Sequence, residues 1–204
     1  MGKYKKSYNR LFELASSQQG FFTAKQAIGA GYANNVHPFH VKSGNWIREM
    51  RGIYRLSNYP PAERPDLVIW SLWSCGYKDK PQGIFSHQTA LSIYDLSDMN
   101  PAKLHMTVPP GFRRFNAIPK ALILYKYSVP ESDIEDMQGF RVTRPLRTIV
   151  DLIAEETVSE DFIEQAVKES LDRGLIQRSK VEGVKRFPAG VVEKLQKIVE
   201  RAGS

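Results

Sequence analysis

The chain has 204 residues, 42% of them hydrophobic and 11% aromatic, so it can bury a core as one large domain or two modest ones. It contains no apolar run of the roughly 18 residues that a membrane-spanning helix needs, and its first residues lack the apolar stretch of a signal peptide. Cys75 is the single cysteine, which excludes an intramolecular disulfide and a cysteine-based zinc site. These features predict a cytoplasmic protein.

The net charge of +7 is concentrated in one part of the sequence. Residues 1–58 hold nine Lys and Arg against two acidic residues, which gives 9 − 2 = +7, whereas residues 59–204 hold twenty of each sign. A positive excess confined to one region is the electrostatic footprint expected of a phosphate-binding surface. The alternative is a solvated face that only keeps the protein in solution.

Two helices are predicted near the start of the chain. An apolar stripe at helical spacing predicts a first helix over residues 5–17. Thr23 is a favourable N-cap for a second helix over residues 24–28, which Gly29 and Gly31 end.

A third helix is predicted over residues 34–44, with Gly44 just past its C-terminal end. Pro38 inside a helix would remove a hydrogen bond and clash with the preceding turn, at about 3 kcal/mol. We favour Asn35 as the N-cap, because this places Pro38 in the first turn, where its missing N–H matters little. In a helix-turn-helix protein this third segment is the recognition helix.

Residues 46–56 predict a β-hairpin, since two runs rich in β-formers flank Met50-Arg51-Gly52. Gly52 is expected to take a positive φ in the turn, and Arg48, Arg51 and Arg55 decorate the ribbon. A basic β-ribbon that follows three helices is the layout of a winged helix-turn-helix.

The prolines of residues 57–65 predict a linker, after which strands and helices mix. The expected elements are a helix from Asp66, strands at 84–86, 104–108 and 122–127, a hairpin over 134–143, and helices at 87–94, 145–155, 160–173 and 188–202. The two strands at 104–108 and 122–127 are joined by a loop that carries Arg113 and Arg114. We therefore predict an α+β fold, with a winged helix-turn-helix domain over residues 1–58 and a mixed α/β domain over residues 66–204.

The chain resembles the AbiEi family, the antitoxins of type IV abortive-infection toxin–antitoxin systems, from about residue 8 to residue 175. In the first region the matching residues are Gly31-Tyr32, Val41, Gly44, Arg48, Arg51-Gly52 and Tyr54-Arg55-Leu56. In the second they are Ser86-His87, Ala90-Leu91, Leu96-Ser97-Asp98, Pro101, Thr107-Val108-Pro109, Thr143, Pro145, Arg147-Thr148 and Asp151. The chain departs from the family pattern at Asn34 and Asn35, at Pro38 and at Glu49.

The resemblance implies a winged helix that binds operator DNA and represses its own operon. It also implies a C-terminal domain that neutralises a nucleotidyltransferase-like toxin, without an enzymatic activity or a cofactor of its own. The partners expected on this basis are double-stranded operator DNA and such a toxin. The oligomeric state stays open.

The candidate DNA contacts come from the second and third helices and from the hairpin. Asn, Ser, His and Lys side chains can bond to bases or phosphates if their helix enters the major groove, and the hairpin arginines can reach the phosphate backbone. The candidates are Lys25, Asn34, Asn35, His37, Lys42, Ser43, Arg48, Arg51 and Arg55. For the residues of the third helix, a capped surface helix is the competing interpretation.

The alternative function is a nuclease or nucleotide-processing enzyme with a DNA-binding N-terminal domain. The sequence offers little chemistry for it: Glu182-Gly-Val-Lys185 is a weak carboxylate–lysine pattern, and His37-x-x-His40 lacks a third metal ligand. Ser86 and His87 are adjacent on a strand, so we expect them to point apart unless a sharp turn intervenes, with Ser86 as the N-cap of the next helix. We therefore predict no catalytic residue and no metal site.

Overall fold

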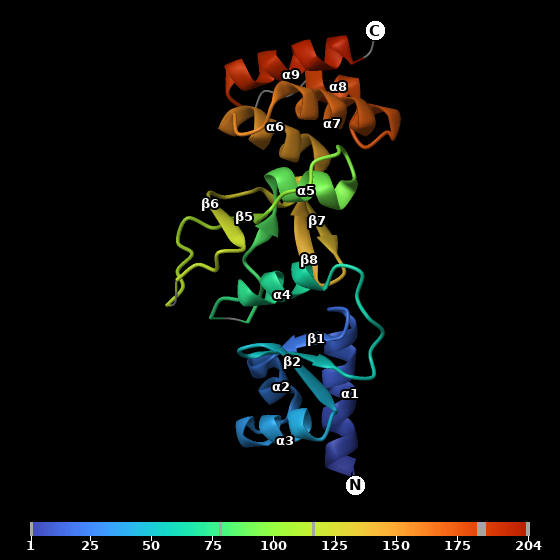
Figure 1. The fold of residues 1–204 in the computed structure, drawn as a ribbon, viewed down its shortest axis with the longest axis vertical. Helices are drawn as coiled ribbons and strands as arrows, with labels where there is room; N and C mark the ends of the chain where they lie inside the picture. Colours follow the sequence, from blue (N-terminus) through green and yellow to red (C-terminus); the bar gives the residue numbers. More distant parts are fainter. Residues whose placement is uncertain (1, 78, 116, 183–186, 203–204) are drawn as a thin grey trace. The chain divides into compact units, whose positions relative to one another are not determined.

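The computed structural model describes residues 2–77, 79–115, 117–182 and 187–202. The chain has an α+β fold with two sheets and divides into two compact units. The first unit comprises residues 1–83 and 136–141, and the second comprises residues 84–135 and 142–204 (Figure 1).

The first unit combines α-helices with a three-stranded antiparallel sheet of order β1-β3-β2. Its elements are α1 (Gly2–Ser16), β1 (Phe21–Thr23), α2 (Ala24–Ala30), the 3₁₀ turn η1 (Asn34–Val36), α3 (His37–Lys42), β2 (Trp46–Met50), β3 (Ile53–Leu56) and α4 (Pro65–Trp73). These bounds confirm the three helices and the hairpin that the sequence predicted, within a few residues at each end.

Local sequence signals set the ends of α2. The Thr23 hydroxyl accepts from the Gln26 N–H at 3.1 Å, and Gln26 Oε1 accepts from the Thr23 N–H at 2.8 Å, which forms a reciprocal capping box. Gly31 ends the helix with φ +107°, a left-handed conformation that side-chain-bearing residues rarely adopt.

The start of α3 differs from the expectation. Asn34–Val36 form a 3₁₀ turn, and α3 begins only at His37, with no side-chain cap. Asn35 is therefore not the cap, because a 3₁₀ turn rather than an extended residue leads into the helix. Pro38 lies in the first turn of α3, as expected, and Gly44 follows the helix with φ +75°.

The β2–β3 hairpin divides its side chains between two faces, as strand alternation requires. Its turn has Gly52 at φ +78°, which confirms the predicted glycine. Trp46 and Leu56 are cross-strand partners and bury against α1 and α2, whereas Ile53 lies on the other face with Phe21.

The first unit extends past the expected boundary at residue 58. Val68 and Leu72 of α4 pack with Phe21 and Ile53, all at most 4% exposed, so this helix closes the second face of the small sheet. The prolines of the linker do interrupt regular structure, but the compact unit continues to Gly83 because the sheet has two apolar faces.

The second unit is built around a mixed five-stranded sheet of order β6-β5-β4-β8-β7, in which β4 pairs antiparallel to β5 and parallel to β8. Its elements are β4 (Ile84–Phe85), α5 (His87–Tyr94), β5 (Leu104–Val108), β6 (Leu122–Lys126), the 3₁₀ turn η2 (Glu131–Asp133), β7 (Ile134–Met137), β8 (Phe140–Thr143), α6 (Pro145–Glu155), α7 (Glu160–Asp172), α8 (Arg178–Glu182) and α9 (Ala189–Arg201). The tip of the β7–β8 hairpin belongs to the first unit.

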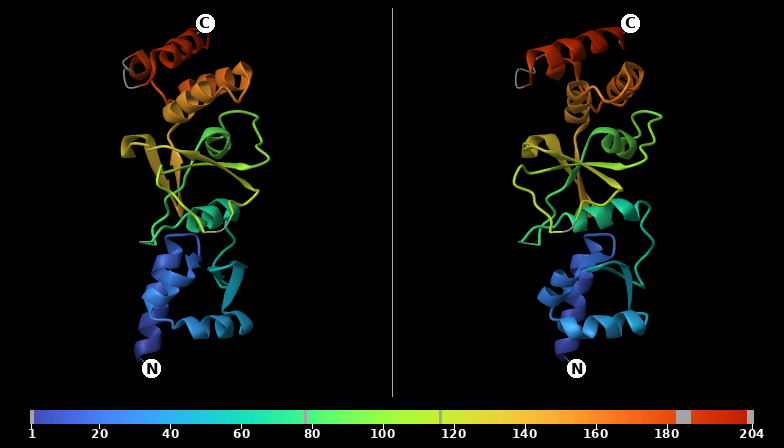
Figure 2. Two further views of the ribbon diagram at one scale, coloured as in Figure 1. Left: turned by 90° about the vertical axis from the view of Figure 1, so that its left-hand side faces the viewer. Right: turned by 60° about the vertical axis from the view of Figure 1, so that its left-hand side comes forward.

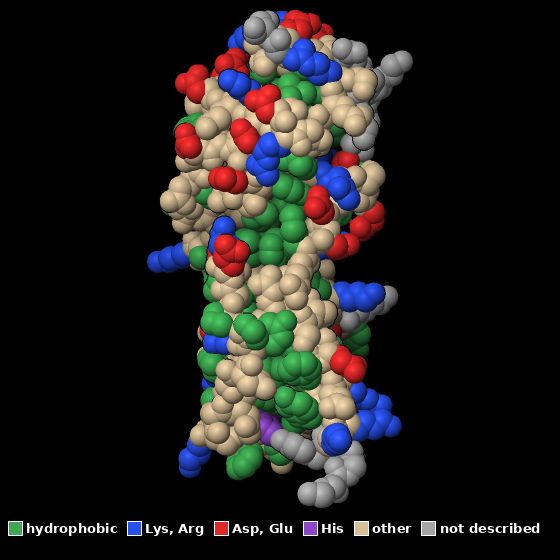
Figure 3. All heavy atoms as spheres, turned by 90° about the vertical axis from the view of Figure 1, so that its right-hand side faces the viewer, with side chains coloured by type: hydrophobic (Ala, Val, Ile, Leu, Met, Phe, Trp, Pro, Cys, Tyr) green, Lys and Arg blue, Asp and Glu red, His purple; other side chains and the backbone are tan. Residues whose placement is uncertain are grey.

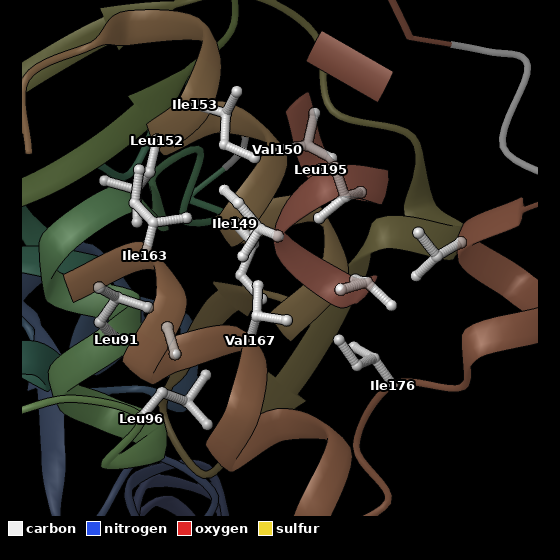
Figure 4. Packing of buried hydrophobic residues seen from close by; sticks show 14 residues of the cluster. Leu91, Leu96, Ile149, Val150, Leu152, Ile153, Ile163, Val167, Ile176 and Leu195 are labelled. Atoms are coloured by element: carbon white, nitrogen blue, oxygen red, sulfur yellow. The ribbon is translucent and has the colours of Figure 1, made fainter. Parts of the chain in front are cut away.

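The core of the second unit lies among its helices. Leu91 of α5, Ile149 of α6, Val167 of α7 and Leu195 of α9 are fully buried and belong to one cluster (Figure 4). The same helices group together in both views of Figure 2. No helix in the described parts of the chain is both long and apolar enough to cross a membrane.

The capping box of α2 yields a first prediction. Replacing Thr23 by Ala removes the hydroxyl that accepts from Gln26, so the free energy of unfolding should fall by about 1 kcal/mol in urea titrations. Thr23→Ser keeps a hydroxyl at the same position and should retain most of the stability. Equal losses in the two variants would contradict the cap assignment.

Candidate nucleic-acid interface

Trp46 fixes α3 against the hairpin. Its ring stacks on His40 with centroids 4.6 Å apart and an interplanar angle of 20°, and it meets His37 at 5.3 Å and Tyr32 at 5.1 Å. Phe22 of β1 approaches the same indole edge-on at 4.9 Å. Because α3 has only six residues, these ring contacts rather than its own hydrogen bonds set its position.

Both histidines of α3 are therefore core residues. His37 is 2% exposed and His40 is 6% exposed, and burial lowers the pKa of each below the ordinary histidine value. Both rings are neutral near pH 7. His37 was predicted to contact DNA, but the structure removes it from the candidate set because its ring lies beneath α3 on Trp46 and Tyr54.

The outer side of α3 presents the remaining predicted residues. Asn34, Asn35 and Lys42 are exposed, and neither asparagine makes a side-chain cap for the helix. Ser43 is exposed but already bonded, since its hydroxyl donates to the His40 carbonyl at 3.3 Å and accepts from Asn45 at 2.9 Å.

Phe39 also lies on this outer side and is 65% exposed, which sequence reasoning missed. The signal was available in the helical period, because His37 and His40 turn inward on the same face and leave residue 39 facing outward.

The three hairpin arginines do not share a face. Arg48 lies opposite Tyr54 and on the same face as Trp46, which is the side of the sheet that α3 covers. Arg51 occupies the exposed turn. Arg55 lies on the other face, where its guanidinium sits 5.9 Å from the Phe21 ring and its Nε donates to Glu49 Oε1 at 2.8 Å.

The ion pair with Glu49 makes Arg55 a weaker candidate for contact with a phosphate. Its side chain is 20% exposed, and the neighbouring carboxylate cancels its charge. By contrast, none of the ion pairs among the described residues involves Lys25, Lys42, Arg48 or Arg51. Lys25 stands apart on α2, with its ammonium 5.9 Å from the Tyr77 ring.

A different surface of the first unit is apolar. Tyr8 and Phe12 of α1 are each 37% exposed with stacked rings 5.9 Å apart, and Phe12 lies 6.4 Å from Tyr59. Figure 3 views the molecule from the side on which α1 lies and shows hydrophobic side chains gathered over the first unit.

In the second unit, Ser86 and His87 pair in a way that the sequence analysis did not expect. His87 takes φ +51°, a sharp turn that brings its Nδ1 to 2.9 Å from Ser86 Oγ. Ser86 precedes α5 but makes no side-chain cap, and its Oγ lies 2.8 Å from Thr107 Oγ1 instead. Both residues are fully buried, so this pair is closed to a substrate.

The pair belongs to a longer buried polar network. Thr107 Oγ1 lies 3.3 Å from the Tyr127 hydroxyl, which bonds to Asp151, and Asp151 accepts from Arg147 Nε at 2.8 Å. The His87 ring also stacks on Tyr125 at 3.7 Å. Burial, with His105 and Arg147 nearby, lowers the pKa of His87 to about 3, so the ring is neutral. The network ties α5, β5 and α6 together.

A cavity of about 480 Å³ lies beside this network, between the start of α6 and residues 174–177. The charged side chains that line the cavity are paired with one another: Arg144 lies 3.4 Å from Glu135, and Arg147 lies 3.6 Å from Asp133. Within the described ranges, no group of three or more His, Cys, Asp or Glu side chains is placed to hold a metal ion. The carboxylate–lysine pattern at 182–185 lies outside them, apart from the backbone of residue 182.

Comparisons with known proteins bear on the fold alone. No protein-family model matches the chain, and no curated protein matches it. The structure is similar to the crystal structure of the RV2827C protein from Mycobacterium tuberculosis, with a TM-score of 0.60 and 9% sequence identity. The likeness covers 97% of this chain and 78% of that one.

The pKa of His87 yields a second prediction. The unfolded chain takes up a proton near pH 6.5 and the folded chain only near pH 3, so stability is complete above pH 6.5 and is lost as the pH falls toward 3. Between pH 6.5 and pH 5 this single ring should account for about 2 kcal/mol of the fall in unfolding free energy.

The test compares urea unfolding of the wild type and His87→Asn at both pH values, since Asn tolerates the left-handed backbone and does not titrate. The variant should show a shallower fall, although His37, His40 and His105 contribute in the same direction. An unchanged pH dependence would show that His87 is not buried in its neutral form.

Proposed function

We propose that the first unit is a winged helix-turn-helix that binds operator DNA. In this assignment α3 is the recognition helix and the β2–β3 hairpin is the wing. The chain is then a transcriptional regulator of the AbiEi type, which represses its own operon and acts without catalysis.

The observation that carries the proposal is the distribution of free cations around α3 and the hairpin. The entire net charge of +7 falls within residues 1–58, and Lys42, Arg48 and Arg51 keep their charges without an acidic partner. Phosphate contacts supply most of the affinity of such proteins for DNA, so uncompensated cations next to a short exposed helix suit this use.

Sequence discrimination is assigned to the exposed residues that begin and flank α3. Asn34 and Asn35 precede the helix and have no capping role, so their amides are available to a base edge such as that of adenine. Phe39 adds an apolar side chain of the kind that contacts a thymine methyl group.

We assign toxin neutralisation to the second unit, with a nucleotidyltransferase-like protein as the partner. This part rests on the sequence resemblance at Ser86-His87, Arg147-Thr148 and Asp151. Their side chains are largely buried, so they would act by holding the fold of the unit rather than by touching the partner.

The wing assignment predicts how salt should affect DNA binding. Each phosphate contact releases about one counterion, so Arg51→Ala should flatten the log–log salt dependence by roughly one unit and weaken all duplexes alike. Arg55→Ala is the matched control, because Glu49 already neutralises that arginine and the slope should stay unchanged. Fluorescence anisotropy at several salt concentrations measures both, and an unaltered slope in Arg51→Ala contradicts the wing.

A substitution in the recognition segment should behave differently. Asn35→Ala should weaken the duplex from the chain's own upstream region by about 1–3 kcal/mol while hardly affecting a scrambled duplex, if the amide contacts a base. Because Asn35 caps nothing, the unfolding free energy should not change. Equal losses on both duplexes would assign Asn35 to phosphate contact, and no loss on either would remove it from the interface.

A growth assay tests the antitoxin part separately. If a nucleotidyltransferase gene adjoins the gene for this chain, coexpression with the wild type or with Arg51→Ala should restore growth, although the variant fails to repress the operon. Absence of rescue by the wild type would refute toxin neutralisation and leave DNA binding intact. Incubation of the protein with plasmid and Mg²⁺ addresses the nuclease alternative, which nicking would support.

A further inference from the structure

A second cationic surface lies in the second unit, within a region whose overall charge is balanced. Residues 99–130 contain five Lys and Arg and no acidic residue, whereas residues 131–173 contain twelve acidic residues and five basic ones. The balance over residues 59–204 therefore hides two segments of opposite sign. The five cations are Lys103, Arg113, Arg114, Lys120 and Lys126.

These cations cluster around the connection between β5 and β6. The two strands are parallel, from Leu104 opposite Leu122 to Val108 opposite Lys126, so the chain must travel back along the sheet between them. Such a crossover usually contains a helix, but the described residues of this one form none and run outside the sheet (Figure 1). We call residues 112–115 and 117–120 the cationic loop.

Both ends of the cationic loop are anchored. Phe112 is 5% exposed and its N–H donates to the Pro109 carbonyl at 2.9 Å. At the other end the Leu122 N–H donates to the Pro119 carbonyl at 3.0 Å, and Leu122 is buried. A turn thus fixes the chain at each end of the cationic loop.

The exposed middle carries an aromatic ring between charges. Phe115 is fully exposed, with a relative accessibility of 107%, and Ile118 is 48% exposed. Arg113 and Arg114 immediately precede the ring, and both are exposed. An exposed aromatic ring next to arginines offers a flat face on which a base of a nucleic acid can stack.

The edge strand of the sheet carries further positive charge. β6 is an edge strand, with Lys120 shortly before it and Lys126 at its end, and both side chains are exposed. None of the ion pairs among the described residues involves Lys103, Arg113, Lys120 or Lys126. Arg113 and Lys120 thus lie in the same loop as the exposed Phe115, and cations together with an aromatic ring are the two elements that bind single-stranded nucleic acids.

We propose that the cationic loop and the β6 edge bind single-stranded nucleic acid. Phe115 stacks on an unpaired base, while Arg113 and Lys120 contact phosphates on either side of it. A single strand fits better than a duplex, because the base faces of a duplex are already stacked on one another. An acidic protein segment would meet the cations but would give the ring no stacking partner.

The experiment measures binding of the full-length protein to fluorescent U-only RNA and T-only DNA of about 12 nucleotides, and to a random duplex. Phe115→Leu keeps an apolar side chain but removes the aromatic face, so it should weaken single-strand binding by about 10-fold, whereas Phe115→Trp should retain it. The RNA and DNA arms distinguish the two sources of unpaired bases. Arg113→Ala should weaken single-strand binding and reduce its salt dependence.

Controls separate this proposal from the operator-binding function. Lys168→Ala removes one exposed cation from α7 and should leave single-strand binding unchanged. Arg51→Ala should weaken the duplex and spare the single strands, and Phe115→Leu should do the opposite.

Two results would overturn the proposal. One is single-strand binding that is absent at low salt or is equal in Phe115→Leu and the wild type. The other is a parallel loss of duplex and single-strand binding in Phe115→Leu, which would make the loop part of a duplex interface. Failure of operator binding alone would leave the proposal standing.

Discussion

The packing of α3 on Trp46 is the contact on which the surface of the first unit depends. A six-residue helix is too short to be stable by itself, and α3 has no side-chain cap at its start. Its two inward histidines stay neutral and lie against the indole, one stacked and one tilted. The helix is thereby held beside the hairpin with Phe39 and Lys42 facing outward.

Strand alternation then decides which arginines can act together. Arg48 and Arg55 are close in sequence and belong to one ribbon, yet they project from opposite faces of the sheet. Arg55 meets Phe21 and Glu49 on the face that α4 closes, while Arg48 stays on the side of α3. The candidate interface therefore contains fewer arginines than the hairpin carries, because Arg55 lies on the face that α4 closes.

In the second unit, a network of buried polar side chains helps to hold the helices on the sheet. From His87 through Ser86, Thr107 and Tyr127 to Asp151, the groups connect α5, β5 and α6 in a low-dielectric interior. Hydrogen bonds are stronger in such an interior than in water, so the network helps to set how α5 and α6 meet the sheet. The left-handed backbone of His87 is the local strain that lets the first pair form.

The sequence by itself determined the elements that depend on neighbours along the chain. Thr23 and Gly31 bound α2, Gly52 forms the hairpin turn, and helical or alternating periodicity located most other helices and strands, because caps, turns and periods are local. The concentration of positive charge in residues 1–58 also follows directly from the sequence.

Only the tertiary structure decided which of these residues are available. In the folded chain His37 is buried against Trp46 and Tyr54, Arg55 is paired with Glu49, and Phe115 is exposed. Local sequence patterns predict none of these three outcomes. The tertiary structure also moved the boundary of the first unit to residue 83, because an apolar helix beyond the linker was needed to cover the second face of a small sheet. Burial and pairing depend on residues distant in sequence, and the chain must fold before they are settled.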